Sequence, residues 1–296
     1  MTTLAHISDV HLGPLPKVRP RDLLSKRITG YINWQLSRIR KMRSDSMSAL
    51  LDHMKAQDAD QIAVTGDLVN LALDEEIDRA GAWLATLGPP DKVCVVPGNH
   101  DAYVRGTLAR ALEAYGPYMS GETLDEHPFP YVRRLGEIAI IGCSSAIVTP
   151  PFFAAGQVSN AQAGRLGRIL DVLGEAGYFR IVLIHHPPTP EFAASRRLGL
   201  WKADIFREVV AASGAEMILH GHTHESSIGA IAGKGADVPV IGVAAASAAP
   251  GGHDSPGRYN LFRIDKVGSD WSCTMREYGY QRVGDDIALR LQLRIY

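Results

Sequence analysis

Cysteine is scarce in this chain, and long apolar runs and an excess of charge are absent. Only three of the 296 residues are cysteine, and Cys94 and Cys143 lie inside apolar segments, so we expect no disulfide. No apolar run approaches the roughly 18 residues that a membrane span requires. The formal net charge of −1 provides no general attraction to nucleic acid. The first nine residues also lack a signal-peptide pattern. These absences predict a soluble cytoplasmic protein without a nucleic-acid polymer as partner.

The first hundred residues alternate between apolar segments of strand length and amphipathic segments of helical length. Hydrophobic residues make up 46% and charged residues 21%, which is ordinary for a folded globular protein. Alternation of strand and helix favours a mostly parallel sheet covered by helices. The expected strands cover residues 4–8, 61–65 and 92–97, and the expected helices cover residues 46–57 and 74–87.

The later part of the chain changes character after His224. Up to that residue we expect helices near 107–115, 160–173 and 203–212, with strands over 138–143, 180–184 and 216–219. Beyond it, apolar segments at 238–244, 259–264, 272–278 and 288–295 follow one another without helices, which predicts antiparallel hairpins forming a second sheet layer. The chain has no long linker and no internal repeat, so residues 1–296 are expected to form one domain.

A basic insertion at about residues 14–45 interrupts the alternation of expected strands and helices. Apolar residues at helical spacing predict an amphipathic helix that packs over apolar surface. Three interpretations remain open: a solvated helix resting on the domain, a lid that binds an anionic substrate, or a segment in peripheral contact with an anionic membrane. The apolar positions are Leu24, Ile28, Ile32, Leu36 and Ile39, and the basic residues are Lys17, Arg19, Arg21, Lys26, Arg27, Arg38, Arg40, Lys41 and Arg43.

Side chains of the types that bind metals follow five of the expected strands. Taken singly, each motif has an ordinary explanation, such as the turn that Gly66 and Asp67 would form. Because strand ends gather at one edge of a sheet, together they predict a two-metal hydrolase site. Imidazole and oxygen donors without thiolates suit manganese, iron or zinc. The residues are Asp9, His11, Asp67, Asn99, His100, Asp101, His185, His222 and His224.

Charge supports a hydrolytic role for such a site. Two divalent cations would carry four positive charges, of which Asp9 and Asp67 cancel two and a bridging hydroxide a third. The centre would stay positive and attract a phosphate, while metal binding lowers the pKa of water from about 15.7 to about 7. His100 could then donate a proton to the leaving alcohol, and Asp101 could orient His100.

The motifs Asp-x-His, Gly-Asp, Gly-Asn-His-Asp, a strand-end His and Gly-His-x-His occur in order between residues 4 and 224. In this the chain closely resembles the calcineurin-like metallophosphoesterase superfamily. It looks most like the bacterial branch of cyclic-nucleotide and glycerophosphodiester phosphodiesterases, given the segments His-Ile-Ser-Asp-Val-His-Leu from His6 and His-His-Pro-Pro from His185. The resemblance implies an α/β fold, a four-layer α/β/β/α sandwich with two stacked mixed sheets.

The resemblance also divides the site residues into roles. It implies one metal held by Asp9, His11, Asp67 and His224, and a second held by Asp67, Asn99, His185 and His222. His100 would be unligated and close to the phosphate, and His185 rather than His186 would be the ligand. The remaining histidines, His6, His53, His127, His220 and His253, match no motif position.

The expected activity is that of a dinuclear-metal-dependent phosphodiesterase. A small phosphodiester, in the first place a 3′,5′-cyclic nucleotide, would be hydrolysed by attack of a metal-bridging hydroxide. One alternative is hydrolysis of a lipid-linked pyrophosphate at the membrane surface. Another is a non-catalytic interaction module with this fold, against which the complete set of ligands argues.

Overall fold

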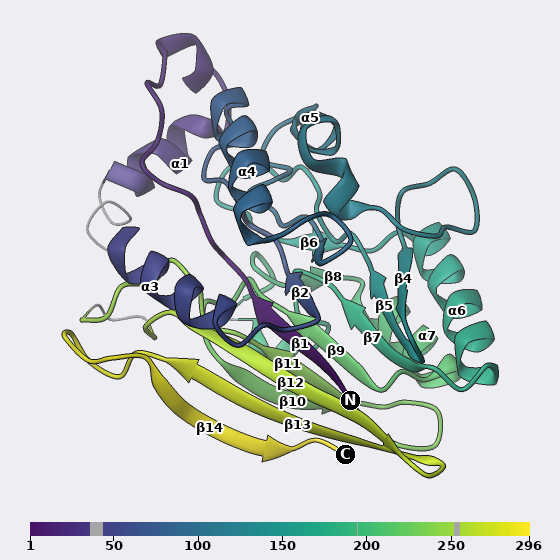
Figure 1. Ribbon diagram of the computed structural model, residues 1–296. Helices are drawn as coiled ribbons and strands as arrows, with labels where there is room; N and C mark the ends of the chain where they lie inside the picture. Colours follow the sequence, from purple (N-terminus) through teal and green to yellow (C-terminus); the bar gives the residue numbers. More distant parts are fainter. Residues whose placement is uncertain (36–43, 194, 252–254) are drawn as a thin grey trace.

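The alternating strands and helices of the first hundred residues form one half of a mixed sheet. The computed structural model describes residues 1–35, 44–193, 195–251 and 255–296. Strands β1 (Thr2–Ile7), β2 (Gln61–Val64) and β3 (Val93–Val95) lie parallel, as the connecting helices α3 (Ser44–Lys55) and α4 (Asp74–Leu87) require. Their carboxyl ends therefore meet at one edge (Figure 1).

Three C-terminal strands complete this first six-stranded sheet. Strand β12 (Arg258–Val267) pairs antiparallel with β1, and β13 (Asp270–Gly279) and β14 (Ala288–Arg294) follow in the order β14-β13-β12-β1-β2-β3. The expectation that the strands after His224 form a sheet layer of their own is therefore wrong. The residue pattern predicted the strands, but it carries no information about the free edge of β1 with which they pair.

The second six-stranded sheet is built from the middle of the chain. Its four central strands are parallel, and an antiparallel strand lies at each edge, in the order β10-β11-β9-β7-β5-β4. The edge strands and the short pair β6 and β8 were not predicted. The strands are β4 (Tyr131–Leu135), β5 (Ile138–Gly142), β7 (Phe179–Leu183), β9 (Met217–His220), β10 (Ser227–Ile231), β11 (Val238–Gly242), β6 (Gly156–Gln157) and β8 (Leu200–Trp201).

The two sheets stack face to face with helices outside them. Helices α3 and α4 lie on one side, and α6 (Asn160–Glu175) and α7 (Ala203–Ser213) on the other, whereas α5 (Thr107–Tyr115) packs beside α4 (Figure 1). This arrangement confirms the predicted α/β fold with two mixed sheets.

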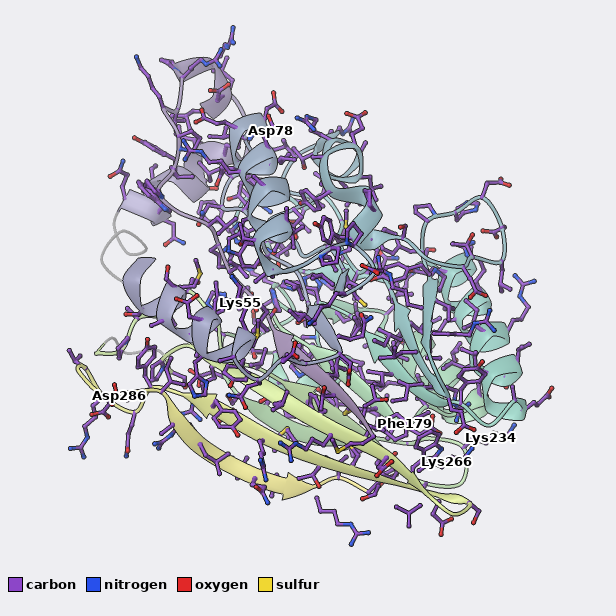
Figure 2. All side chains as sticks on the ribbon, viewed as in Figure 1. Lys55, Asp78, Phe179, Lys234, Lys266 and Asp286 are labelled. Atoms are coloured by element: carbon purple, nitrogen blue, oxygen red, sulfur yellow. The ribbon has the colours of Figure 1, made fainter. Side chains whose placement is uncertain are left out.

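Side chains on β7 show why both faces of the second sheet are covered. Phe179, Ile181 and Leu183 belong to the core between the sheets, whereas Val182 belongs to the core under α6 and α7, because successive side chains of a strand point to opposite faces. The ring of Phe179, labelled in Figure 2, lies 5.3 Å from that of Trp271 on the opposite sheet.

The described part of the basic insertion contains a 3₁₀ helix, η1 (Pro20–Leu23), and the short helix α1 (Arg27–Asn33). The apolar residues at helical spacing do not pack on the protein as expected, since Leu24, Ile28 and Ile32 are 87%, 48% and 52% exposed. Leu15, Val18 and Tyr31 of the same insertion do pack against the core. The positions Leu36, Arg38, Ile39, Arg40, Lys41 and Arg43 lie outside the described residues. No helix in the described ranges has both the length and the apolar character needed to cross a bilayer.

Candidate metal centre

The strand ends of both sheets deliver the predicted ligands to one place. Asp9 follows β1, Asp67 follows β2 and Asn99 follows β3, while His185 and His222 follow β7 and β9 of the other sheet. Backbone hydrogen bonds join these ends, from the amide of His11 to Asp67 and from that of Gly221 to His185. The site is thus a junction between the two sheets rather than a property of either one.

The clustering involves almost all of the predicted residues. Four groups of three side chains each bring ligand atoms within 4.8 Å of one another, and most of the residues in them are buried. The groups are Asp9, His11 and His224; His11, Asp67 and His100; Asp9, Asp67 and His185; and His185, His186 and His222.

Backbone carbonyls fix which nitrogen of each histidine faces the centre. The Nδ1 of His11 donates to the carbonyl of Val69 at 3.1 Å, and the Nδ1 of His185 donates to the carbonyl of Thr65 at 2.5 Å. A carbonyl only accepts, so the Nε2 of each neutral ring keeps its lone pair for another partner. In His222 the two nitrogens exchange these roles. Its Nε2 donates to the carbonyl of Leu198 at 2.6 Å, so its Nδ1 keeps the lone pair that can bind a metal.

These lone pairs face other electron-pair donors. The Nε2 of His185 lies 3.2 Å from Asn99 Oδ1, and the Nε2 atoms of His11 and His224 lie 3.3 Å apart. Asp9 Oδ1 is buried and lies 3.2 Å from the Nε2 of His224, without a hydrogen bond of good geometry among the described residues. Buried lone pairs that face one another need a proton or a cation between them. The arrangement therefore fits divalent metal ions.

The electrostatics of the metal-free site agree with this fit. Burial alone would raise the pKa of Asp67, but His185 and His100 hold that pKa well below its ordinary value. Burial alone would lower the pKa of His185, but the Asp67 carboxylate raises it to about 9. Without metal His185 therefore carries an extra proton, which a cation would displace on binding.

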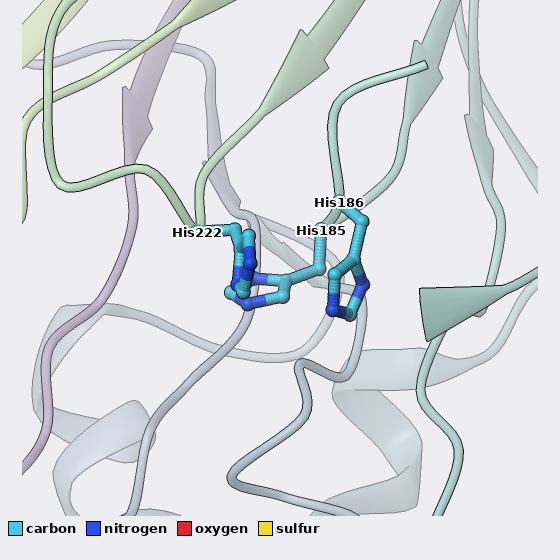
Figure 3. Close-up of side chains that lie close together, drawn as sticks. All are labelled: His185, His186 and His222. Atoms are coloured by element: carbon cyan, nitrogen blue, oxygen red, sulfur yellow. The ribbon is translucent and has the colours of Figure 1, made fainter. Parts of the chain in front are cut away.

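The adjacent histidine, His186, is occupied differently. Its Nδ1 lies 2.8 Å from the hydroxyl of Ser145, and its Nε2 donates to the carbonyl of Ala154 at 3.1 Å. Both nitrogens are thus engaged, and the ring packs 4.3 Å from that of His222 (Figure 3). These contacts favour His185 as the ligand and give His186 a packing role behind His222.

His100 sits at the edge of the cluster and is more accessible than the buried ligands. Its Nδ1 donates to the carbonyl of Asn70 at 2.5 Å, its Nε2 lies 4.0 Å from Asp67 Oδ2, and its ring stacks on Tyr103 with centroids 5.2 Å apart. Its side chain is 15% exposed. The orienting contact expected from Asp101 is thus supplied by Asn70.

Asp101 holds the loops together instead. Its carboxylate accepts hydrogen bonds from the backbone amides of Gly98, Asp67 and Leu68 at 2.8, 2.9 and 3.1 Å. Burial and the neighbouring Asp67 raise its pKa to about 7. Asp101 thereby fixes the loop after β2 against the loop after β3.

The backbone at the site is strained. Among non-glycine residues, left-handed φ values occur at five of the predicted ligands: Asp9 (54°), His11 (42°), Asp67 (56°), His222 (70°) and His224 (59°). Each such conformation costs about 1–3 kcal/mol and persists only where the surroundings enforce it. A concentration of such conformations on the predicted ligands is typical of functional sites.

Sequence reasoning missed two residues that support the ligands. The buried Glu76 carboxylate accepts hydrogen bonds from the amides of Asn70, Leu71 and Leu73, and so holds the loop whose carbonyls bind His11 and His100. Its position at the start of an acidic helix was the available signal. Ser145 binds His186 and follows the end of β5, as the ligands follow their own strands.

The histidines without a motif position have other partners. His6 bonds to Thr65, His53 to Tyr259, His127 to Asp125 and His220 to Ser227. His253 lies outside the described residues.

A cavity of about 220 Å³ opens onto the cluster. Asp67, Asn99, His100, His222 and His224 contribute to its lining. A phosphate group that entered this cavity would meet ligand side chains and His100 together.

Comparisons with known proteins agree with the arrangement. A family model described as calcineurin-like phosphoesterase matches residues 2–226, a span that contains all of the predicted site residues. Among solved structures, a dimetal phosphatase from Danio rerio has a TM-score of 0.68 at 14% identity, over 99% of this chain and 98% of that chain. A sulfate thiohydrolase from Thermus thermophilus, in complex with glycerol, has a TM-score of 0.52 at 15% identity, over 99% of this chain and 56% of that chain. No curated protein sequence matches. At these identities the structural likeness shows the fold alone.

Proposed function

The chain belongs to the calcineurin-like phosphoesterase family, and on that premise we propose that it hydrolyses a small phosphodiester with the help of two divalent metal ions. The observation that carries the proposal is the position of Asp67. One of its oxygens, Oδ2, lies 3.4, 3.8 and 4.0 Å from the Nε2 atoms of His185, His11 and His100. A carboxylate shared in this way between two ligand clusters suits a bridging role.

The ligand sets are those that the resemblance to the family implies, and the clustering of the side chains is compatible with them. One ion would be held by Asp9, His11, Asp67 and His224, and the other by Asp67, Asn99, His185 and His222. Bound manganese, iron or zinc would neutralise phosphate charge and lower the pKa of water.

His100 is the residue best placed to move a proton. Because its Nδ1 proton is committed to Asn70, the ring must be doubly protonated to donate from Nε2 to a leaving oxygen. The nearby Asp67 carboxylate favours that charged form, and stacking on Tyr103 limits rotation of the ring. A positioned general acid contributes about 10²- to 10⁴-fold to the rate.

A 3′,5′-cyclic nucleotide is the first substrate to test, because the motifs of the chain resemble those of the bacterial phosphodiesterase branch. A lipid-linked pyrophosphate is the second candidate, and the exposure of Leu24, Ile28 and Ile32 in a basic segment next to the site supports it.

The test is a substrate panel on metal-free protein reconstituted separately with manganese, iron and zinc. It compares an aryl phosphodiester, cyclic nucleotides, glycerophosphodiesters, phosphomonoesters and a lipid-linked pyrophosphate. The expected result is metal-dependent diester hydrolysis. The His100→Asn variant should lose it for diesters with an alkyl leaving group, and the remote, exposed His127→Asn control should retain it for every diester. Absence of turnover with every metal would overturn the proposal.

A further inference from the structure

A second cavity, of about 480 Å³, adjoins the metal-centre cavity. The two share Asn99, His100 and Ala154 in their linings, so they meet beside the histidine that is proposed to donate the proton. A phosphoester whose phosphate lies at the metal centre can therefore extend a substituent into the second cavity.

The basic insertion forms one wall of this second cavity. Arg27 donates from Nε to the carbonyl of Leu71 at 2.8 Å and from Nη2 to that of Ala72 at 2.5 Å. Lys26 donates from Nζ to Thr149 Oγ1 at 2.5 Å and to the carbonyl of Phe153 at 2.7 Å. These bonds tie the N-terminal end of α1 to two different loops, so the protein's own contacts hold this wall of the cavity.

Much of the lining that α1 and the facing loop contribute is apolar. Ile32 and Trp34 come from the insertion, Tyr103 from the loop after β3, and Phe152 and Phe153 from the loop that Lys26 holds. A Cβ atom at Gly30 would lie 2.2 Å from the Tyr103 hydroxyl, so glycine lets the helix approach the ring this closely.

Two apolar side chains are exposed at the mouth of the cavity, beside the exposed polar residue Asn33. Ile32 is 52% exposed and Phe152 is 76% exposed, and Phe152 is held at a φ of 67°. A bulky residue in the left-handed region is an outlier that marks a constrained position. Exposed apolar side chains at the mouth of a cavity are typical of a binding site for an apolar ligand.

We propose that the second cavity binds an aliphatic substituent of the phosphoester, so that the substrates of this protein are amphiphilic phosphoesters. The inference rests on the proposed function for the position of the phosphate. A flexible chain can follow the apolar part of the lining out over Ile32 and Phe152. On this inference an alkyl phosphoester ranks above the cyclic nucleotide that the sequence motifs suggest.

The test is a series of alkyl p-nitrophenyl phosphate diesters with methyl, butyl and octyl groups, used below their aggregation limits with manganese-loaded protein. The value of kcat/KM is expected to rise by about fourfold for each methylene buried, the equivalent of ~0.8 kcal/mol. Ile32→Asp should flatten the series. Val172→Asp is the control, because Val172 is an apolar residue of α6 at 64% exposure and does not line the cavity.

Three outcomes would overturn the inference: no dependence on chain length in the wild type, an equal dependence in Ile32→Asp, or faster turnover of a nucleoside p-nitrophenyl phosphate than of the octyl diester. Calorimetric binding of methyl-, butyl- and octylphosphonate separates this inference from the proposed function. Tighter binding of the longer phosphonates without hydrolysis of any diester would refute the proposed function and support the cavity assignment. Hydrolysis without any effect of chain length would support the proposed function and refute the cavity assignment.

Discussion

The Nδ1 atom of His185 donates a hydrogen bond of 2.5 Å to the carbonyl oxygen of Thr65. This contact joins the carboxyl end of β7 in the second sheet to that of β2 in the first. It sets the tautomer of the neutral His185 ring. The neighbouring Asp67 carboxylate separately favours the charged form of that ring. The ligand geometry therefore depends on how the two sheets are stacked.

Replacement of His185 by Gln should weaken metal binding, whereas replacement of His186 by Gln should leave it unchanged. His185→Gln removes a nitrogen that faces Asn99 and Asp67, so the affinity for one of two metal ions should fall at least ~10-fold. His186→Gln should retain two ions, because both nitrogens of His186 bond within the protein. Metal content after dialysis measures the difference, and the opposite pattern would make His186 the ligand.

His100→Asn should reduce turnover without changing metal content. The loss should be about 10²- to 10⁴-fold for an alkyl leaving group, which needs a proton, and much smaller for p-nitrophenolate, which does not. Steady-state rates for the two kinds of diester provide the comparison. An equal loss on both would contradict the role of proton donor.

Gly98→Ala should damage the centre although residue 98 supplies no ligand atom. A Cβ atom there would lie 2.2 Å from Asp67 Oδ1, so the shared carboxylate would have to move. We expect destabilisation of about 1–3 kcal/mol in urea unfolding, together with weaker metal binding. Gly164→Ala is the control, because a Cβ atom at that helical position has no neighbour within 4 Å among the described residues. Metal binding as strong as in the wild type would contradict the close packing of the two loops.

Asp101 should make the metal-free protein less stable as pH rises. Burial and Asp67 raise its pKa from an ordinary 3.8 to about 7, so between these values the folded state binds more protons than the unfolded state. Stability therefore falls with increasing pH across this window. The Asp101→Asn variant has no titrating group at this position. The free energy of unfolding of the variant minus that of the wild type should therefore be larger at pH 7.5 than at pH 5. Urea unfolding at the two pH values measures the gain, and a constant difference would refute the shift.

Most of the fold could be predicted from local residue patterns. Helix α4 begins and ends where the pattern placed it, and the strands that carry ligands were found to within a few residues. The pairing of β12 with β1 was not predicted, because alternation of apolar residues specifies a strand but not its neighbour. The exposure of Leu24, Ile28 and Ile32 was missed for a related reason, since helical spacing identifies an apolar face but not what covers it.

The sequence by itself determined which residues are candidate ligands and their order at strand ends, since motif chemistry and strand period are local properties of the chain. Only the tertiary structure decided how those ligands are held. The tautomers of His11 and His185 come from carbonyls about 58 and 120 residues away, and the left-handed φ of Asp67 is enforced by packing against Gly98 and Asp101. Such contacts join segments that are distant in sequence, and their distances depend on the stacking of two sheets, which no local pattern encodes.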